Sequence, residues 1–177
     1  MDARIAELVR TGADDALDAL YARYADEIQG VAYLILGDRF AAEDVMAETL
    51  ITAWRRGRDL RDDSALRPWL MRIATNHALA MRRRRRDVRS IDDIDVATPD
   101  TTGPLAARIA LSAAVDRLPV EMRAAVALHY FADLSVDDVA RALGKSPNTI
   151  KSQLRVGLGQ LRAAWGRADD RRFQDVG

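Results

Sequence analysis

Acidic side chains gather in one short segment and are the first candidates for chemistry. Glu43, Asp44 and Glu48 lie close together and could serve a metal-dependent nuclease or phosphotransferase. The segment holds no histidine, and the chain has no cysteine, which excludes disulfides, thiolate nucleophiles and cysteine zinc sites. His77 and His129 fall in predicted helices, where a packed, hydrogen-bonded histidine is commoner than a ligand or a base. We therefore predict no catalytic residue, no metal and no cofactor, and a protein that is not an enzyme.

The segment LSVDDVARALGKSPNTIKSQL carries a different chemistry, the recognition of DNA. Gly144 is suited to end one helix, and Ser146 with Pro147 to begin the next, so two helices should join through a tight turn. Ile150 and Leu154 should bury one side of the second helix. The other side presents amide, hydroxyl and cationic groups suited to base edges and phosphates, on Asn148, Thr149, Lys151, Ser152 and Arg155. This pattern predicts a helix-turn-helix recognition helix. The alternative is a helical hairpin with a solvated polar face.

A second DNA-binding surface is predicted upstream, on a helix that Pro68 can begin. Leu70 and Ile73 belong to the inner, apolar stripe of this helix. Its outer stripe recurs at offsets of three and four residues and is polar and basic, with Arg72, Thr75, Asn76, Leu79, Arg82 and Arg83. The arginine run over 82–86 extends this surface, which is suited to phosphates. The alternative is a solvated helix end.

The spacing of apolar residues indicates that helices position all these side chains. One amphipathic helix of about 20 residues begins near Asp14 and ends at Gly37, with Leu20 and Ile28 on its apolar face. A second helix follows, with Val45 facing inward and acidic residues facing outward. No alternating strand pattern is present. We predict an all-α fold made of two small helical domains joined by a flexible linker.

The domain boundary is predicted where the periodicity gives way to Asp, Thr, Pro and Gly, the composition of a solvated connector. The predicted divisions are a first domain over 1–86, a linker over 87–104, a second domain over 105–166 and a tail over 167–177. No stretch approaches the ~18 apolar residues of a membrane span. We therefore expect a cytoplasmic protein without membrane insertion.

Charge is divided between segments although the chain as a whole is neutral. The 177 residues include 27 basic and 27 acidic side chains. Residues 1–54 hold 4 basic and 11 acidic side chains, whereas residues 55–89 hold 12 basic and 4 acidic ones. An acidic surface and a polyanion-binding surface should therefore occupy different parts of the first domain.

Three segments resemble the extracytoplasmic-function (ECF) branch of the bacterial sigma-70 factors. The stretch AAEDVMAETLITAWRR resembles the region 2.2 helix, and PWLMRIATNHALAMRRRRR resembles regions 2.3 and 2.4. LPVEMRAAVALHYFADLSVDDVARALGKSPNTIKSQLRVGLGQLR resembles region 4. The matches follow the family's order, and the chain leaves no room for region 1.1 or a substantial region 3. This points to the ECF branch.

The resemblance implies binding to core RNA polymerase, through the clamp coiled coil of the largest subunit and the flap of the second-largest. Asp44 and Glu48 match the acids that dock on the clamp, and Ala47 stands where the family usually has Gln. The resemblance also implies promoter DNA as a partner, and an anti-sigma factor that holds the free protein. Such a protein directs polymerase to promoters and helps to open the duplex.

The resemblance further assigns the two DNA-binding surfaces to the two promoter elements. For the minus-10 element, a loop over 60–67 with Asp63 and Ser64, together with Asn76, would hold a base flipped out of the non-template strand. Phosphate contacts would come from the outer-stripe arginines, Arg72, Arg82 and Arg83. The recognition-helix set would read the minus-35 element. The alternative function is a stand-alone helix-turn-helix regulator that binds an operator as a dimer, for which the sequence offers no heptad or apolar patch.

Overall fold

The computed structural model describes residues 2–88 and 113–174. Every regular element in these ranges is helical, which confirms the predicted all-α fold. In chain order the elements are α1 (Asp2–Thr11), α2 (Ala16–Leu36), α3 (Arg39–Arg55), the 3-10 turns η1 (Gly57–Asp59) and η2 (Asp63–Ala65), α4 (Leu66–Val88), α6 (Val120–Val126), the π-helical turn η4 (Ala127–Phe131), α7 (Val136–Leu143) and α8 (Pro147–Gln174). Most of the predicted linker lies outside the described residues.

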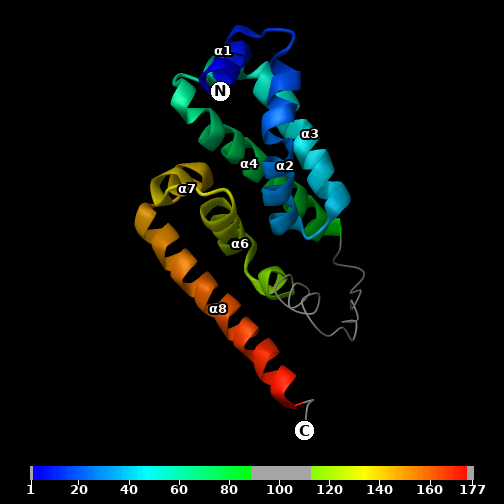
Figure 1. Ribbon diagram of the computed structural model, residues 1–177, viewed down its shortest axis with the longest axis vertical. Coiled ribbons are helices and arrows are strands. Elements are labelled where there is room, and N and C mark those ends of the chain that lie inside the picture. Colours follow the sequence, from blue (N-terminus) through cyan, green and yellow to red (C-terminus); the bar gives the residue numbers. More distant parts are fainter. Residues whose placement is uncertain (1, 89–112, 175–177) are drawn as a thin grey trace.

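The first unit is built by α2, α3 and α4, which pack against one another (Figure 1). Leu20 and Ile28 of α2 and Leu70 of α4 are fully buried, and each such side chain contributes ~1.5–3 kcal/mol through the area it removes from water. Gly37 ends α2 in the left-handed conformation with φ 70°, as the sequence predicts. His77 and Thr52 hydrogen-bond each other at 3.1 Å, so this histidine is a packed one that joins α4 to α3.

The first unit differs from the sequence predictions in two respects. α4 begins at Leu66, so Pro68 lies inside the first turn, where a missing N–H still costs no intrahelical hydrogen bond. α1 is an additional helix that the apolar pattern did not predict. It buries Ile5, Ala6 and Val9 against the rest of the unit.

The second unit has the helix-turn-helix that the sequence predicts. The Ser135 side chain caps α7 by accepting the Asp138 N–H at 3.1 Å, and Gly144 ends the helix with φ 64°. Ser146 caps α8 in the same way, accepting the Thr149 N–H at 3.1 Å. α8 continues to Gln174, past the predicted domain end at 166.

The two units pack against each other, an arrangement that the sequence did not reveal. α6 and η4 contact α2, and α7 contacts α4, while α8 runs along the outside (Figure 1). The ring of Phe131 packs against Gly30, where an added Cβ would come within 2.4 Å of it. At the C-terminal end of α2, the Asp116 carboxylate lies beside Gly37. Gly30 and Gly37 are two turns apart, so both open the same face of α2 to the second unit.

Arg123 of α6 is the polar centre of this contact and is only 1% exposed. Its Nη1 donates to the carbonyl oxygen of Ile35 at 3.1 Å and to the Asp116 carboxylate at 3.0 Å, and its Nη2 donates to the Leu118 carbonyl at 3.2 Å. Arg82 of α4 also donates to the Ile35 carbonyl, at 3.3 Å. Burial, and then the charge of Arg82, lower the pKa of Arg123. Two like charges therefore meet at one carbonyl.

Candidate nucleic-acid interface

The exposed face of α8 is the better-formed of the two predicted DNA-binding surfaces. Ile150 is fully buried and Leu154 is 6% exposed, which orients the helix. The five predicted contact residues are all exposed, namely Asn148, Thr149, Lys151, Ser152 and Arg155. Among the described residues, neither cation of this set forms an ion pair. The face therefore offers hydrogen-bonding groups and two unneutralised charges to a major groove.

Contacts with α6 hold α8 in place, and the sequence did not identify them. Lys145 in the turn before α8 binds Glu121 of α6 at 2.8 Å. Gly157 is buried at the crossing of the two helices, where an added Cβ would lie 3.1 Å from Met122 and from Val126. Gly157 could have indicated this contact from the sequence, because a glycine inside a helix often marks a closely packed neighbour.

The predicted outer stripe of α4 is only partly a surface. Arg72, Asn76 and Arg83 are exposed. Thr75 is fully buried and donates to the Met71 carbonyl at 2.8 Å. The expectation of one continuous polar face through all six residues is therefore wrong. The reason is that α4 is covered on more than one side, since it contacts α2 and α3 and also α7.

The two remaining members of that stripe are also partly enclosed. Leu79 is half-buried and packs against the core. Arg82 is half-buried, and its Nη1 donates to the carbonyl oxygens of Ile35 and Leu36 at 3.3 and 3.4 Å. These carbonyls end α2, where the helix dipole favours a cation. Arg82 is thus engaged within the first unit, because α2 and α4 both belong to it.

The loop before α4 is ordered by its own side chains. Asp62 accepts the Ser64 N–H at 2.9 Å and the Ser64 hydroxyl at 2.8 Å. The hydrogen bond from the Ser64 hydroxyl, and to a smaller extent the one from the Ser64 N–H, hold the pKa of Asp62 below its ordinary value. Asp63 binds Arg10 of α1 at 2.6 Å. Both predicted contact residues, Asp63 and Ser64, therefore sit in a preformed turn next to α4.

A half-buried ion pair, which the sequence did not predict, fixes the end of this loop at the start of α4. Arg67 makes a two-pronged contact with Glu27 of α2, with Nη2–Oε1 at 2.6 Å and Nε–Oε2 at 3.3 Å. The two side chains are 30% and 18% exposed. Such a forked pair fixes direction as well as distance, so it sets where α4 starts relative to α2.

The acidic strip of α3 lies on the surface. Asp44, Ala47 and Glu48 are all exposed, while Val45 and Met46 between them are buried. In the part of the chain that the structure describes, neither acid forms an ion pair. No group of three potential metal ligands occurs among the same residues. The strip therefore presents negative charge that no neighbouring cation in the described residues neutralises.

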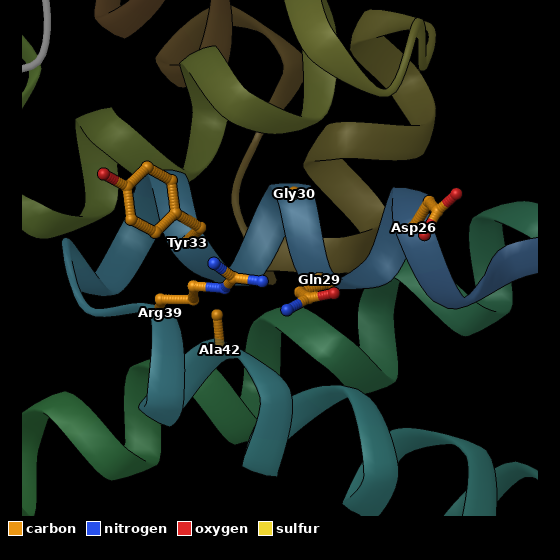
Figure 2. Close-up of a pocket in the computed structure, with 6 residues that line it drawn as sticks. All are labelled: Asp26, Gln29, Gly30, Tyr33, Arg39 and Ala42. Carbon is orange, nitrogen blue, oxygen red and sulfur yellow. The ribbon is translucent and has the colours of Figure 1, made fainter.

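A hollow of about 400 Å³ lies between α2 and α3. Asp26, Gln29, Gly30, Tyr33, Arg39 and Ala42 line it (Figure 2). The guanidinium of Arg39 points toward Gln29, and Asp26 lies beyond Gln29 (Figure 2). This arrangement brings together no acid, base and nucleophile of the kind that catalysis requires. No described helix is long and apolar enough to cross a membrane.

Two protein families match the chain in successive segments. Sigma-70 region 2 matches residues 20–88, and Sigma-70, region 4 matches residues 108–161. The ECF RNA polymerase sigma factor SigE of Mycolicibacterium smegmatis is 34% identical over 154 residues, which cover 82% of this chain and 60% of SigE. SigL of Mycobacterium tuberculosis is 30% identical over 81% of this chain and 85% of its own. The sigma-H factor of Pseudomonas aeruginosa is 31% identical over 86% and 88%.

Two solved structures share the fold. CnrH in complex with the cytosolic domain of CnrY matches with a TM-score of 0.70 and 23% identity, over 92% of this chain and 95% of CnrH. RpoE in complex with the anti-sigma factor NepR from Bartonella quintana matches with a TM-score of 0.68 and 22% identity, over 85% and 96%. At these identities the likeness concerns the arrangement of helices.

Proposed function

Since the chain belongs to the sigma-70 family, in its ECF branch, we propose that it binds core RNA polymerase and directs it to a defined set of promoters. The observation that carries this proposal is the succession of three exposed surfaces in the family's order. These are the acidic strip of α3, the exposed basic residues of α4 and the recognition face of α8. The match to region 2 argues against a stand-alone helix-turn-helix regulator, which would need no polymerase-docking helix.

Docking on the polymerase is assigned to α3 in the first unit. Asp44 and Glu48 would face the clamp coiled coil of the largest subunit, and their exposure beside the small Ala47 leaves that face accessible. The second unit would bind the flap of the second-largest subunit. Complementary charge mainly sets the rate and register of such an encounter, so the acidic strip should act early in assembly.

Promoter recognition is divided between α8 and the α4 region. The α8 face would read the minus-35 element in the major groove. Asn76, with Asp63 and Ser64 in the adjacent loop, would hold one extruded base of the minus-10 element, and Arg72 and Arg83 would hold phosphates. Thr75 and Leu79 are reassigned to the packing of α4 against the core, because neither offers a free polar group to DNA.

Arg82 keeps its proposed phosphate role on one condition, that its side chain leaves the α2 carbonyls of its own unit. While it donates to these carbonyls, Arg82 is withheld from DNA. Its charge would then add to the sequence-independent part of the DNA affinity, which weakens as salt rises.

The remaining assignments follow from the family. The chemistry of RNA synthesis would belong to the core enzyme, so this chain would act as a binding subunit in the cytoplasm. The solved relatives are complexes, one of CnrH with the cytosolic domain of CnrY and one of RpoE with the anti-sigma factor NepR. We propose that an anti-sigma factor likewise binds this protein.

Co-elution with purified core polymerase tests the docking step. The unaltered chain should co-elute with core enzyme, and the double reversal Asp44→Lys with Glu48→Lys should weaken this by at least about tenfold. The matched control is Asp18→Lys, which reverses an exposed acid on α2 away from the strip. Failure of the unaltered chain to bind core enzyme would overturn the proposed function. Equal binding by the double variant would remove the acidic strip from the interface.

A further inference from the structure

The N-terminal helix α1 lies directly on the loop that joins α3 to α4. It contacts both short turns of that loop, η1 and η2, and the three elements meet at one end of the first unit (Figure 1). The region 2 family match begins at residue 20, so α1 lies before the matched segment. Its relation to the loop is therefore not given by the family match.

The first contact is a backbone approach at η1. An added Cβ on Gly57 would lie 1.9 Å from the carbonyl oxygen of Val9, and Gly57 is buried. No side chain fits there unless α1 moves, because the obstructing atom belongs to the backbone. Ile5, Ala6 and Val9 are buried along the same helix, so α1 is held rigidly against the turn.

The second contact is an ion pair at η2. Arg10 Nη1 lies 2.6 Å from Asp63 Oδ1, joining residues that are 53 positions apart. The two side chains are 42% and 35% exposed, so the pair is weak in energy but sets the direction of the Asp63 carboxylate. Between the two turns, Leu60 is 2% exposed and anchors the loop in the core. Contacts with α1 therefore fix both turns of the loop.

We propose that α1 is a positioning element for the minus-10 loop, with Arg10 and the Val9–Gly57 contact as the parts through which it acts. This inference rests on the proposed function, since the loop is the one assigned to the extruded base. A pocket holds a flipped base only when its hydrogen-bonding groups are fixed beforehand. α1 supplies that fixation for Asp63, and through the shared turn for Ser64.

The mechanism separates two steps of initiation. Loss of the α1 contacts should slow strand opening, because the loop then samples other conformations. It should leave minus-35 binding unchanged, because α8 is held by α6 through Gly157 and Glu121–Lys145, which lie in the other unit. A direct phosphate contact by Arg10 would also slow opening, so the test has to tell positioning from direct binding.

The experiment uses holoenzyme made with the full chain and a promoter fork carrying 2-aminopurine at each non-template minus-10 position in turn. Arg10→Ala should reduce the extrusion signal and the opening rate about two- to fivefold, the range that an exposed ion pair supports. Gly57→Ala should reduce them roughly tenfold or more, with its fold checked by circular dichroism. Duplex binding at the minus-35 element should stay unchanged in both variants.

Controls and double variants make the result specific. Arg4→Ala removes an exposed arginine from the same helix, and Gly159→Ala adds a methyl group in open space; both should behave like the unaltered chain. Arg10→Ala combined with Asp63→Ala should be no worse than the Asp63→Ala variant, and Arg10→Lys should restore part of the signal. Additive losses would mean that Arg10 binds DNA directly, and would overturn the positioning role.

The failures of the two proposals are distinguishable. If the unaltered holoenzyme extrudes no minus-10 base, the proposed role of the loop is wrong and α1 has nothing to position. If it extrudes a base and Arg10→Ala and Gly57→Ala do so equally well, the loop keeps its role and the inference about α1 alone is overturned.

Discussion

Single residues decide which of the predicted DNA contacts are available. The amphipathic pattern of α8 was enough to assign its exposed residues, because Ile150 and Leu154 fix one rotation of the helix. On α4 the same reasoning misplaced Thr75, because a second apolar stripe with Met71 and Ala78 is buried as well. A sequence pattern reports which residues are polar. It does not report how many neighbours a helix has.

The first residue-scale prediction concerns Arg155. Arg155→Ala should weaken recognition of the minus-35 element by ~1–3 kcal/mol, because it removes an unneutralised guanidinium from the recognition face. Binding of the full chain in holoenzyme to promoter duplexes, measured over a range of salt concentrations, gives this value. Arg162→Ala is the matched control on the same helix, because this exposed arginine lies two turns beyond the predicted set. An unchanged promoter profile for Arg155→Ala would remove it from the site.

The second residue-scale prediction compares neighbours on α4. Asn76→Ala should impair open-complex formation while duplex binding at the minus-35 element survives, because Asn76 is exposed at the proposed pocket. Thr75→Val should leave opening unchanged, since the Thr75 hydroxyl only donates to its own helix at Met71. Permanganate footprinting of the opened strands measures both. Equal loss of opening and duplex binding in Asn76→Ala would show that Asn76 has a structural role.

At the scale of elements, caps and apolar spacing predicted most of the secondary structure. α2, α3, α7 and α8 follow from stripes longer than two turns and from Gly37, Gly144 and Ser146 at their ends. α1 was missed, although Ile5, Ala6 and Val9 form its apolar stripe and Gly12 with φ 70° follows it. The π-helical turn η4 could not be predicted either, since it depends on the Ala132 N–H reaching the Ala127 carbonyl at 3.0 Å.

The element-scale prediction concerns Asp38, which caps α3 and also joins it to α4. Its carboxylate accepts the Ala41 N–H at 3.1 Å and binds Arg85 at 2.7 Å. Asp38→Ala should cost about 1 kcal/mol in the free energy of unfolding at pH 7, and Asp38→Asn should cost less, because asparagine still caps. Urea unfolding of the three proteins gives these differences.

The same residue predicts a pH dependence. The Ala41 N–H, and then Arg85, hold the pKa of Asp38 below its ordinary 3.8 in the folded protein. The stabilisation by Asp38 is therefore complete above pH 3.8 and is lost as the pH falls through the lowered pKa. The stability gap between the unaltered protein and Asp38→Ala should narrow at pH 3. A gap of constant size would show that the cap acts without its charge.

At the scale of the whole molecule, we propose that the packed arrangement opens so that both units reach their promoter elements. In this family the elements lie about 17 base pairs apart, or ~58 Å at ~3.4 Å per step. A linker of the predicted length, 87–104, spans at most ~60 Å when extended. Formation of the contact between the units buries Arg123 near Arg82. The burial of this charge and its repulsion by Arg82 both oppose the contact. Docking of two units could not be read from the sequence, since it depends on Gly30 and Gly37 sharing a face of α2.

The whole-molecule prediction uses Gly30. Gly30→Leu should separate the units in solution, because the ring of Phe131 occupies the space that any side chain at this position needs. Because the chain has no cysteine, cysteines introduced at Asp18 and Arg162 can carry a fluorophore pair that reports the distance. Gly159→Leu, which adds a side chain in open space, should leave the distance unchanged. An unchanged distance in Gly30→Leu would show that the Phe131 contact does not hold the units together.

The most direct test of the central claim is transcription in vitro with purified core polymerase and a library of genomic fragments, followed by sequencing of the transcript starts. We predict a limited set of starts that appear only when this chain is added, each preceded by two shared sequence elements at a fixed separation. Transcription without defined starts, in the absence of any inhibitor, would contradict it.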